Sequence, residues 1–228
     1  MASFTVRNTL LCGFICLFVS ITHAQNQLIV STYATEKQEG IQLYQWDEAK
    51  GVLIKMSSVS GVENPSFIAM HPYGKYMIAV SEVANDTQAF IVSYRFNKNT
   101  LVPINKSLVQ GEHPCYVSFS ADGKWIFTAN YSSGNIAVHQ FTDSIHSIQH
   151  SIASTGGSVH PTRQTKSHAH AILQTPNQKY IWITNLGNDR IYVHRYDALN
   201  GISYKPEAVF ACVAGSGPRH IAFHPSLP

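Results

Sequence analysis

The stretch Pro65–Tyr76 (PSFIAMHPYGKY) sets the pattern of the chain, because similar stretches follow it three more times. The later copies are Pro114–Trp125 (PCYVSFSADGKW), Ala169–Tyr180 (AHAILQTPNQKY) and the shorter Pro218–Pro225 (PRHIAFHP). Their first residues are 49, 55 and 49 positions apart. A period near 50 residues, with about four short strands in each unit, is typical of the blades of a β-propeller.

Short runs rich in Val, Ile, Tyr and Phe alternate with Gly, Asn and Asp, and no segment keeps a 3.6-residue apolar period. These patterns predict an all-β fold, a β-propeller of four-stranded blades. We expect a partial blade at residues 27–60, full blades at 64–110, 113–163 and 168–213, and the start of a fifth blade at 217. Because a propeller covers its strand edges by closing the ring, we expect an incomplete ring and a longer parent protein.

Residues 1–24 have the features of a secretory signal peptide, which leaves residues 25–228 as the partial propeller domain. Arg7 precedes the apolar run Thr9–Ile21, and the small residue Ala24 ends the segment. The run is too short to span a bilayer comfortably, and no cysteine follows it at a lipidation position. We therefore expect an exported protein, periplasmic or extracellular, without a membrane partner after cleavage.

The formal net charge is +3, and it falls to +2 when Arg7 leaves with the leader. This balance gives no reason to expect nucleic acid or an anionic membrane as partner. Cys115 and Cys212 then remain, so one disulfide is arithmetically possible and its formation stays open. No Walker loop or Gly-x-Ser-x-Gly elbow is present. Their absence argues against a serine hydrolase and against a nucleotide enzyme, and we expect a monomer that needs no cofactor.

The repeat aligns two sets of positions at the start of the blades. The first set is Ser66, Cys115, His170 and Arg219; the second, two residues earlier, is Asn64, His113, His168 and Gly217. Residues i and i+2 of a strand point to the same face, as His168 and His170 would. Since the first strand of each propeller blade lies nearest the central channel, we expect both sets to converge there from neighbouring blades.

His170 and Arg219 bring chemistry to these positions. Imidazole can move a proton near neutral pH, and a guanidinium suits a carboxylate, a phosphate or a developing oxyanion. We predict that the pair forms part of a site; the alternative is that it fills the channel and hydrogen-bonds to neighbouring blades. A three-imidazole metal site of His168, His170 and His220 is conceivable, but His-x-His alone is a weak signal, and we predict no metal.

Other polar and aromatic residues have more ordinary interpretations. Asp189–Arg190 is either a structural pair across a turn or a ligand contact. Arg163 and Lys166 fall on a loop that is interpreted as solvated. The aromatic residues of the strand faces are interpreted as core: Tyr33, Tyr76, Trp125, Tyr180 and Trp182.

Four motifs follow one another at compatible spacing: Asn130–Asn135 (NYSSGN), Ser167–His170 (SHAH), Leu186–Arg190 (LGNDR) and Gly217–Pro225 (GPRHIAFHP). Together they resemble the seven-bladed β-propeller lactonase family, which includes bacterial 6-phosphogluconolactonase and fungal carboxy-muconate lactonizing enzymes. The resemblance implies that about four of seven blades are present. It also implies a Glu and a second Arg from later blades, and the spacing from Ser66 to Glu82 places that Glu about seven residues beyond Pro228.

The function that the resemblance implies is hydrolysis of a small-molecule lactone in carbohydrate metabolism, as in 6-phosphogluconolactonase. His168 or His170 would be the general base and Arg219 would stabilise the oxyanion or hold an anionic group of the substrate. Further substrate contacts are expected from His220, His113, Asp189 and Arg190. Because export conflicts with a cytoplasmic phosphorylated substrate, a sugar lactone or another exported ester-like metabolite is a candidate. A non-catalytic propeller that binds a partner or glycan, and a muconate-type cycloisomerase, stay open as alternatives.

Overall fold

A computed structural model describes residues 26–85 and 87–224 of the chain, and the predicted leader lies outside these ranges. The described residues form sixteen strands in four antiparallel sheets. None of them belongs to a helix long and apolar enough to cross a membrane. The all-β prediction is therefore confirmed.

Each sheet corresponds to one predicted blade. Blade one has three strands: β1 (Gln27–Ser31), β2 (Ile41–Asp47) and β3 (Val52–Val59). Blade two has β4 (Ile68–Met70), β5 (Tyr76–Ser81), β6 (Phe90–Asn97) and β7 (Thr100–Leu108). Blade three has β8 (Pro114–Phe119), β9 (Trp125–Asn130), β10 (Asn135–Phe141) and β11 (Ile145–Ala153). Blade four has β12 (Ala169–Gln174), β13 (Tyr180–Asn185) and β14 (Arg190–Asp197), and β14 pairs with both β15 (Gly201–Ile202) and β16 (Ala208–Ala211).

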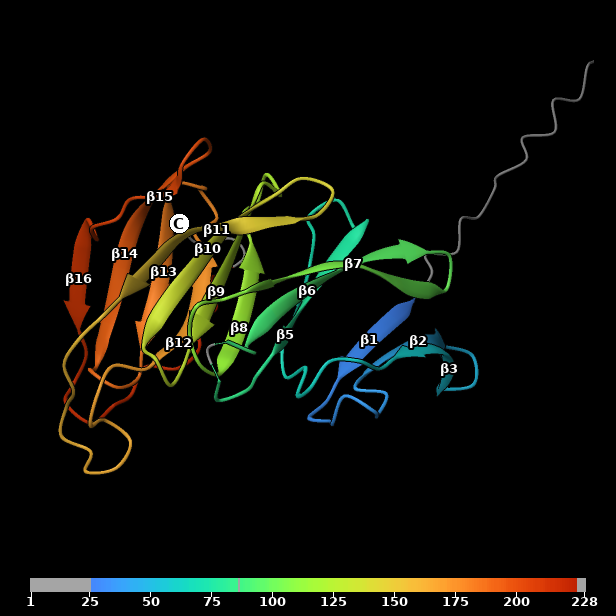
Figure 1. Ribbon diagram of the computed structural model, residues 1–228, viewed down its shortest axis with the longest axis horizontal. Helices are drawn as coiled ribbons and strands as arrows, with labels where there is room; N and C mark the ends of the chain where they lie inside the picture. The colour runs from blue at the N-terminus through green and yellow to red at the C-terminus, as the bar shows by residue number, and fades with distance from the viewer. Residues whose placement is uncertain (1–25, 86, 225–228) are drawn as a thin grey trace, which may run out of the picture.

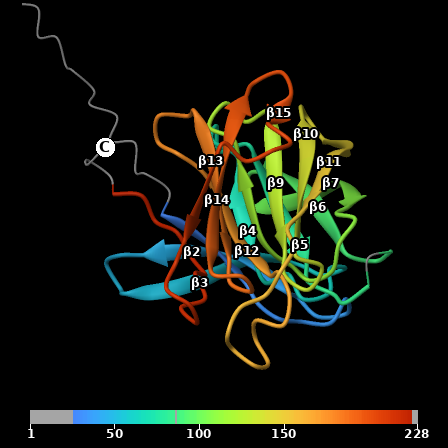
Figure 2. The ribbon, with the colours of Figure 1, turned by 90° about the vertical axis from the view of Figure 1, so that its left-hand side faces the viewer.

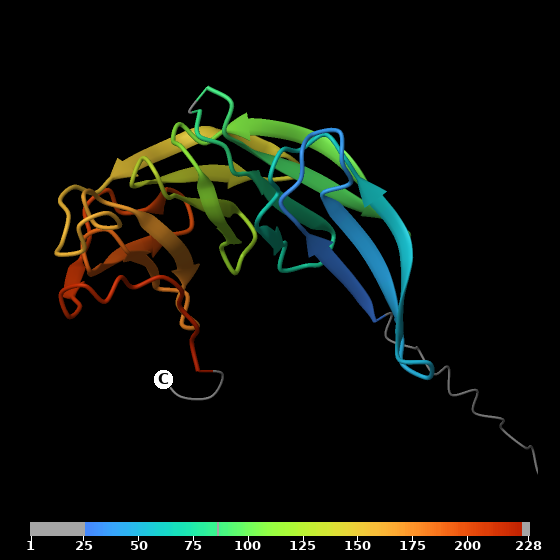
Figure 3. The ribbon, with the colours of Figure 1, turned by 90° about the horizontal axis from the view of Figure 1, so that it is seen from below.

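The blades follow one another in chain order along an arc, with blade one at one end and blade four at the other (Figures 1 and 3). Figure 2 looks onto this arc from the side of blade four. The first strands of consecutive blades are neighbours, since β8 contacts both β4 and β12. This arrangement places the starts of the blades together, as the repeat predicts.

A recurring β-bulge shows which strands correspond between blades. The pairing of the last two strands shifts register after Leu43 in blade one, after Ser93 in blade two and after Val138 in blade three. By this correspondence β1 is a second strand, equivalent to β5 and β9. In the part of the chain that the structure describes, no strand pairs with the edge of β1 that faces away from β2.

Residues 217–224 differ from the sequence expectation. They were expected to begin a fifth blade, but they form no strand in the structure. A β-strand is held in a sheet by hydrogen bonds to a neighbouring strand, and among the described residues no strand pairs with this segment. The segment nevertheless carries Arg219 and His220 back to blade four, where the Thr184 hydroxyl donates to the Arg219 carbonyl at 2.8 Å.

The hydrophobic core lies between the blades. In β5, Ile78 and Val80 pack into a cluster shared with blade three, whereas Met77 and Ala79 pack into one shared with blade one. A third cluster joins blades three and four. Because successive strand residues point to opposite faces and both faces are covered, the inner strands are apolar at nearly every position.

The predicted core aromatics include one error. Tyr76 and Trp125 are 6% and 3% exposed, and Tyr180 and Trp182 are half-buried. Tyr33 is 68% exposed, because it lies on the loop after β1 and not on a strand face. Its hydroxyl instead donates a hydrogen bond to Glu82, which places it at the candidate site described below.

Candidate active site

A hollow of about 470 Å³ lies where the starts of the blades meet. All four members of the first predicted set line it: Ser66, Cys115, His170 and Arg219. The remaining lining residues are Tyr33, Phe67, Glu82, Tyr131, Arg163 and His220. We call this hollow the axial pocket. The repeat therefore predicted correctly that these four positions converge.

Arg219 and His170 are in direct contact in the axial pocket. The Arg219 Nε–H donates to His170 Nε2 at 2.7 Å. In the described part of the chain neither Nη group of Arg219 makes a hydrogen bond or ion pair. Arg219 is an exposed residue, whereas His170 is 6% exposed in β12. The buried His170 imidazole thus orients the guanidinium, and both Nη groups are left to donate to a ligand.

His170 is electrically neutral at physiological pH in this environment. Burial lowers its pKa to about 4, and the charges of Arg219, His220 and Arg163 act in the same direction. Since Nε2 accepts from Arg219, the ring proton belongs on Nδ1, which is buried and has no hydrogen-bond partner among the described residues. The imidazole is consequently an acceptor that orients Arg219.

His168 has a different environment from His170. Its Nδ1–H donates to the Tyr131 carbonyl at 2.8 Å, and its ring stacks on the Tyr131 ring at 4.3 Å. It is 7% exposed and does not line the axial pocket. His168 lies before β12 begins, and β12 has a bulge between Ala169 and Ala171, so the i, i+2 rule does not apply. The structure thus places His168 behind Tyr131.

His113 also lies outside the pocket lining. The backbone shows why: Asn64, His113 and Gly217 have positive φ angles of 46°, 51° and 55°. This second set of equivalent positions, apart from His168, therefore marks a left-handed turn that leads into each blade. His113 Nδ1 lies 2.7 Å from the Ser132 hydroxyl, and its backbone N–H donates to the Val83 carbonyl.

Asp189 and Arg190 do not line the axial pocket either. Asp189 is 4% exposed and accepts hydrogen bonds from the backbone amides of Gly215 and Gly217, both at 2.6 Å. Burial alone would raise its pKa, but hydrogen bonds from Ser158, the two glycines and Gln164 outweigh that effect and hold the pKa at about 2. Asp189 therefore fixes the segment that precedes Arg219, while Arg190 is exposed.

His220 does line the pocket, as predicted. Its ring meets the His170 ring edge-on, with centroids 5.2 Å apart. Among the described residues no three His, Cys, Asp or Glu side chains are grouped so that they could hold a metal ion. Cys115 is half-buried, and burial followed by the charge of Glu82 raises the pKa of its thiol to about 12. Such a thiol is not a nucleophile at neutral pH.

Five residues of the pocket lining were not assigned to the site from the sequence: Tyr33, Phe67, Glu82, Tyr131 and Arg163. Glu82 and Tyr131 occupy equivalent positions, each directly after the second strand of its blade, so the repeat could have identified both. Tyr33 was interpreted as core, and its exposure and its place in the pocket lining correct that interpretation. Arg163 is exposed on its loop, as expected, and it also lines the pocket. Both of these residues lie on connecting loops, whose paths no repeat specifies.

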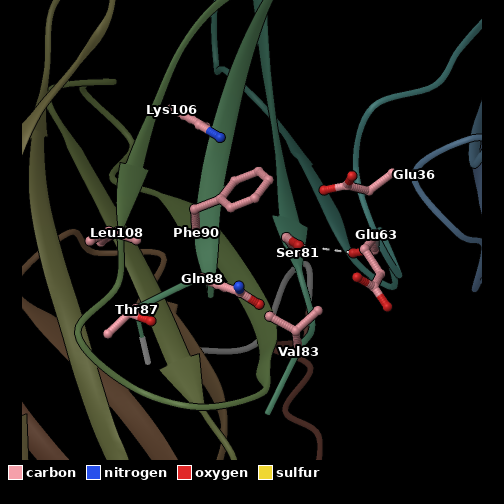
Figure 4. A pocket seen from close by; sticks show the side chains of 9 residues that line it. All are labelled: Glu36, Glu63, Ser81, Val83, Thr87, Gln88, Phe90, Lys106 and Leu108. Atoms are coloured by element: carbon pink, nitrogen blue, oxygen red, sulfur yellow. Dashed lines mark hydrogen bonds between the residues drawn. The ribbon is translucent and has the colours of Figure 1, made fainter. Parts of the chain in front are cut away.

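A second hollow of about 610 Å³ lies between blades one and two (Figure 4). Glu36 and Glu63 border it on one side, and Phe90 of β6 and Lys106 of β7 on the other. Glu36 and Glu63 are exposed residues, and Ser81 donates to the backbone carbonyl of Glu63. This hollow contains none of the predicted site residues, so the axial pocket is the better candidate site.

Comparisons with known proteins agree with the fold. The family described as "Lactonase, 7-bladed beta-propeller" matches residues 27–228. The 6-phosphogluconolactonase of Bacillus subtilis is 32% identical over 200 residues, which cover 86% of this chain and 56% of the relative. A solved structure of a candidate 6-phosphogluconolactonase from Bacteroides fragilis superimposes with a TM-score of 0.82 at 31% identity, covering 90% of this chain and 59% of that one. The periplasmic gluconolactonase of Pseudomonas aeruginosa gives a TM-score of 0.76 at 30% identity, covering 87% and 58%. The chain thus spans little more than half the length of these relatives.

Proposed function

The chain belongs to the seven-bladed β-propeller lactonase family, and we propose that the complete protein hydrolyses a sugar lactone in the axial pocket. The observation that supports this proposal best is the 2.7 Å contact between Arg219 and His170 at the converging blade starts. It supplies a cation with unused donors next to a neutral imidazole. Lactone opening needs both, one for the carbonyl oxygen and one for the proton of water.

In the proposed reaction, the Nη groups of Arg219 bind the lactone carbonyl oxygen and stabilise the negative charge that develops on it. When the guanidinium turns to the substrate, Nε2 of His170 is released and can accept a proton from the attacking water. The hydroxyl forms a bond to the carbonyl carbon, the ring C–O bond breaks, and the leaving oxygen takes the proton from His170. The product is the open hydroxy acid. His168 acts as a positioning residue through Tyr131.

The substrate that we favour is an unphosphorylated sugar lactone outside the cytoplasm. Two observations support this choice: the sequence of residues 1–24 predicts export, and one similar structure is a periplasmic gluconolactonase. The curated relative from Bacillus subtilis acts, by its name, on a phosphorylated lactone. A phosphorylated substrate is therefore the direct competitor to test.

The test uses the complete protein and glucono-1,5-lactone. It measures the rate of acid release and subtracts the rate of spontaneous hydrolysis of the lactone. Arg219→Gln should lower kcat/KM by roughly 100- to 1000-fold, the usual cost of losing an oxyanion donor. His170→Asn should cause a loss of at least similar size. Arg190→Gln removes an exposed arginine outside the pocket and serves as the matched control. Wild-type turnover in the Arg219 variant would refute the assignment.

A non-catalytic binding function is the second candidate. One observation favours it: the lone pair of His170 Nε2 is already used by Arg219, so the resting geometry offers this base no direct access to water. Saturable binding of gluconate without turnover of any lactone in a substrate panel would favour this candidate over hydrolysis.

A further inference from the structure

We propose that Glu82, held by Tyr33, recognises the hydroxyl groups of the substrate and thereby selects polyhydroxylated lactones over unsubstituted ones. The proposal rests on the lactone hydrolysis proposed above and adds the group that determines its specificity. It is supported by the position of Glu82, by its unused hydrogen-bonding capacity and by the charges that share the axial pocket with it.

The backbone of Glu82 is fixed at the pocket wall. The residue directly follows β5, and its N–H donates to the Asn64 carbonyl at 3.1 Å. The Asn64 side-chain amide donates back to the Glu82 carbonyl at 3.4 Å. Because Asn64 is the residue whose left-handed backbone leads into blade two, these bonds tie Glu82 to the same turn that positions Ser66. The half-buried carboxylate consequently lies at the pocket wall.

The carboxylate is oriented by a residue from another blade. The Tyr33 hydroxyl, on the loop after β1, donates to Glu82 Oε2 at 2.8 Å. Burial and then the Glu82 carboxylate raise the pKa of Tyr33, so the phenol keeps its proton and remains a donor. Among the described residues Oε1 of Glu82 makes no hydrogen bond, and Glu82 makes no ion pair. One oriented acceptor is thus left for a ligand.

The charges of the axial pocket indicate what that ligand is. Arg219 and Arg163 line the same pocket as Glu82, yet neither neutralises it by an ion pair in the described part of the chain. A carboxylate accepts hydrogen bonds but cannot donate them, so its partner must be a hydroxyl, an N–H group or a cation. The two arginines disfavour a cationic ligand in this pocket.

A neutral polyhydroxylated lactone satisfies both ends of the pocket. Its carbonyl oxygen accepts from the Nη groups of Arg219, and its hydroxyls donate to Oε1 of Glu82. Both groups can reach one ligand because Glu82 and Arg219 line the same pocket, together with Cys115. A lactone without hydroxyls makes no such bond, so it gains nothing from the half-buried carboxylate, which keeps its hydrogen bond from Tyr33 and its access to water.

The test compares kcat/KM for glucono-1,5-lactone with kcat/KM for 1,5-valerolactone, which has the same ring without hydroxyls. In the complete protein, Glu82→Gln should lower the value for gluconolactone by roughly 10- to 100-fold and change that for valerolactone less than about 2-fold. Tyr33→Phe should also lower kcat/KM for gluconolactone and not for valerolactone. The loss should be smaller than in Glu82→Gln, because the carboxylate remains. The matched control is Glu63→Gln, an exposed carboxylate of the second hollow.

Equal losses on both lactones, or no loss on either, would overturn the role of Glu82 while leaving lactone hydrolysis intact. If the wild-type protein opens neither lactone, the proposed function fails, and calorimetric binding of gluconate and 5-hydroxyvalerate decides the role of Glu82 separately. Weaker binding of gluconate alone in Glu82→Gln supports the proposal. Unchanged gluconate binding, or weaker binding of both acids, overturns it.

Discussion

Lowering the pH from 7 to 5 is expected to destabilise the folded chain through His139 in β10. This imidazole is 0% exposed, and its Nε2–H donates to the Leu108 carbonyl at 3.1 Å across the junction of blades two and three. Its Nδ1 is buried without a hydrogen-bond partner among the described residues. A second proton would have to reside on that unpaired nitrogen, so the fold strongly favours the neutral ring.

The size of the effect follows from the pKa. Burial lowers the pKa of His139 to about 4, against an ordinary value of 6.5. Between these two values the unfolded chain binds a proton that the folded chain does not. Stability is therefore fully present above pH 6.5 and falls as the pH drops toward 4. For this shift, linkage gives a loss of about 2 kcal/mol between pH 7 and pH 5.

Urea denaturation at the two pH values, for wild type and His139→Gln, measures this loss. Glutamine retains an N–H donor for Leu108 but does not titrate, so the variant should lack the His139 share of the pH dependence. With an m-value of about 2 kcal/mol per M, that share is a midpoint difference of roughly 1 M urea. His146→Gln removes an exposed histidine and should behave as wild type. Identical pH dependence in wild type and His139→Gln would refute the reasoning.

Three further predictions concern the axial pocket. Asp189→Asn removes the charged acceptor for the Gly215 and Gly217 amides. Urea denaturation should show a loss of about 1–3 kcal/mol in the free energy of unfolding, and gluconate should bind more weakly. Unchanged gluconate binding would contradict the role given to Asp189 in positioning the segment before Arg219. In a pH–rate profile kcat/KM should fall only as the pH drops to about 4, because the pKa of His170 is about 4. A fall that is centred near pH 6.5 would show that another group is titrating. The Cys115 thiol, with a pKa of about 12, should resist a disulfide reagent at pH 8 until urea is added, as mass spectrometry of the labelled chain can show.

The fold could be predicted from the sequence because each blade repeats the same pattern of apolar strand residues and turn residues. The offsets between Pro65, Pro114, Ala169 and Pro218 located the blades, and the equivalence of His170 with Arg219 predicted that they converge, as their 2.7 Å contact shows. That inference needs only the propeller geometry, in which equivalent positions of neighbouring blades face one another.

The details that failed depend on geometry that residue spacing does not carry. His113 was assigned to the site by strand alternation, but its φ of 51° shows a turn and not a strand. The bulge at the start of β12 likewise breaks the alternation between His168 and His170. Tyr33 and Arg163 reach the pocket from loops, where the path of the backbone depends on tertiary contacts. Glu82 is different, because the repeat aligns it with the Glu expected beyond Pro228, although the sequence analysis did not assign it to the site.

The bonds that join the blades also position the side chains of the pocket. The Cys115 thiol of blade three lies 3.6 Å from the His170 carbonyl of blade four, and the His168 imidazole holds the Tyr131 carbonyl of blade three. Tyr33 of blade one holds the carboxylate of Glu82 in blade two. A change at a blade junction should therefore alter ligand binding even when it touches no ligand. In the described part of the chain two hydrogen bonds hold Arg219 to blade four, one from the Thr184 hydroxyl to its carbonyl and one from its Nε–H to His170, so loss of either should displace the guanidinium.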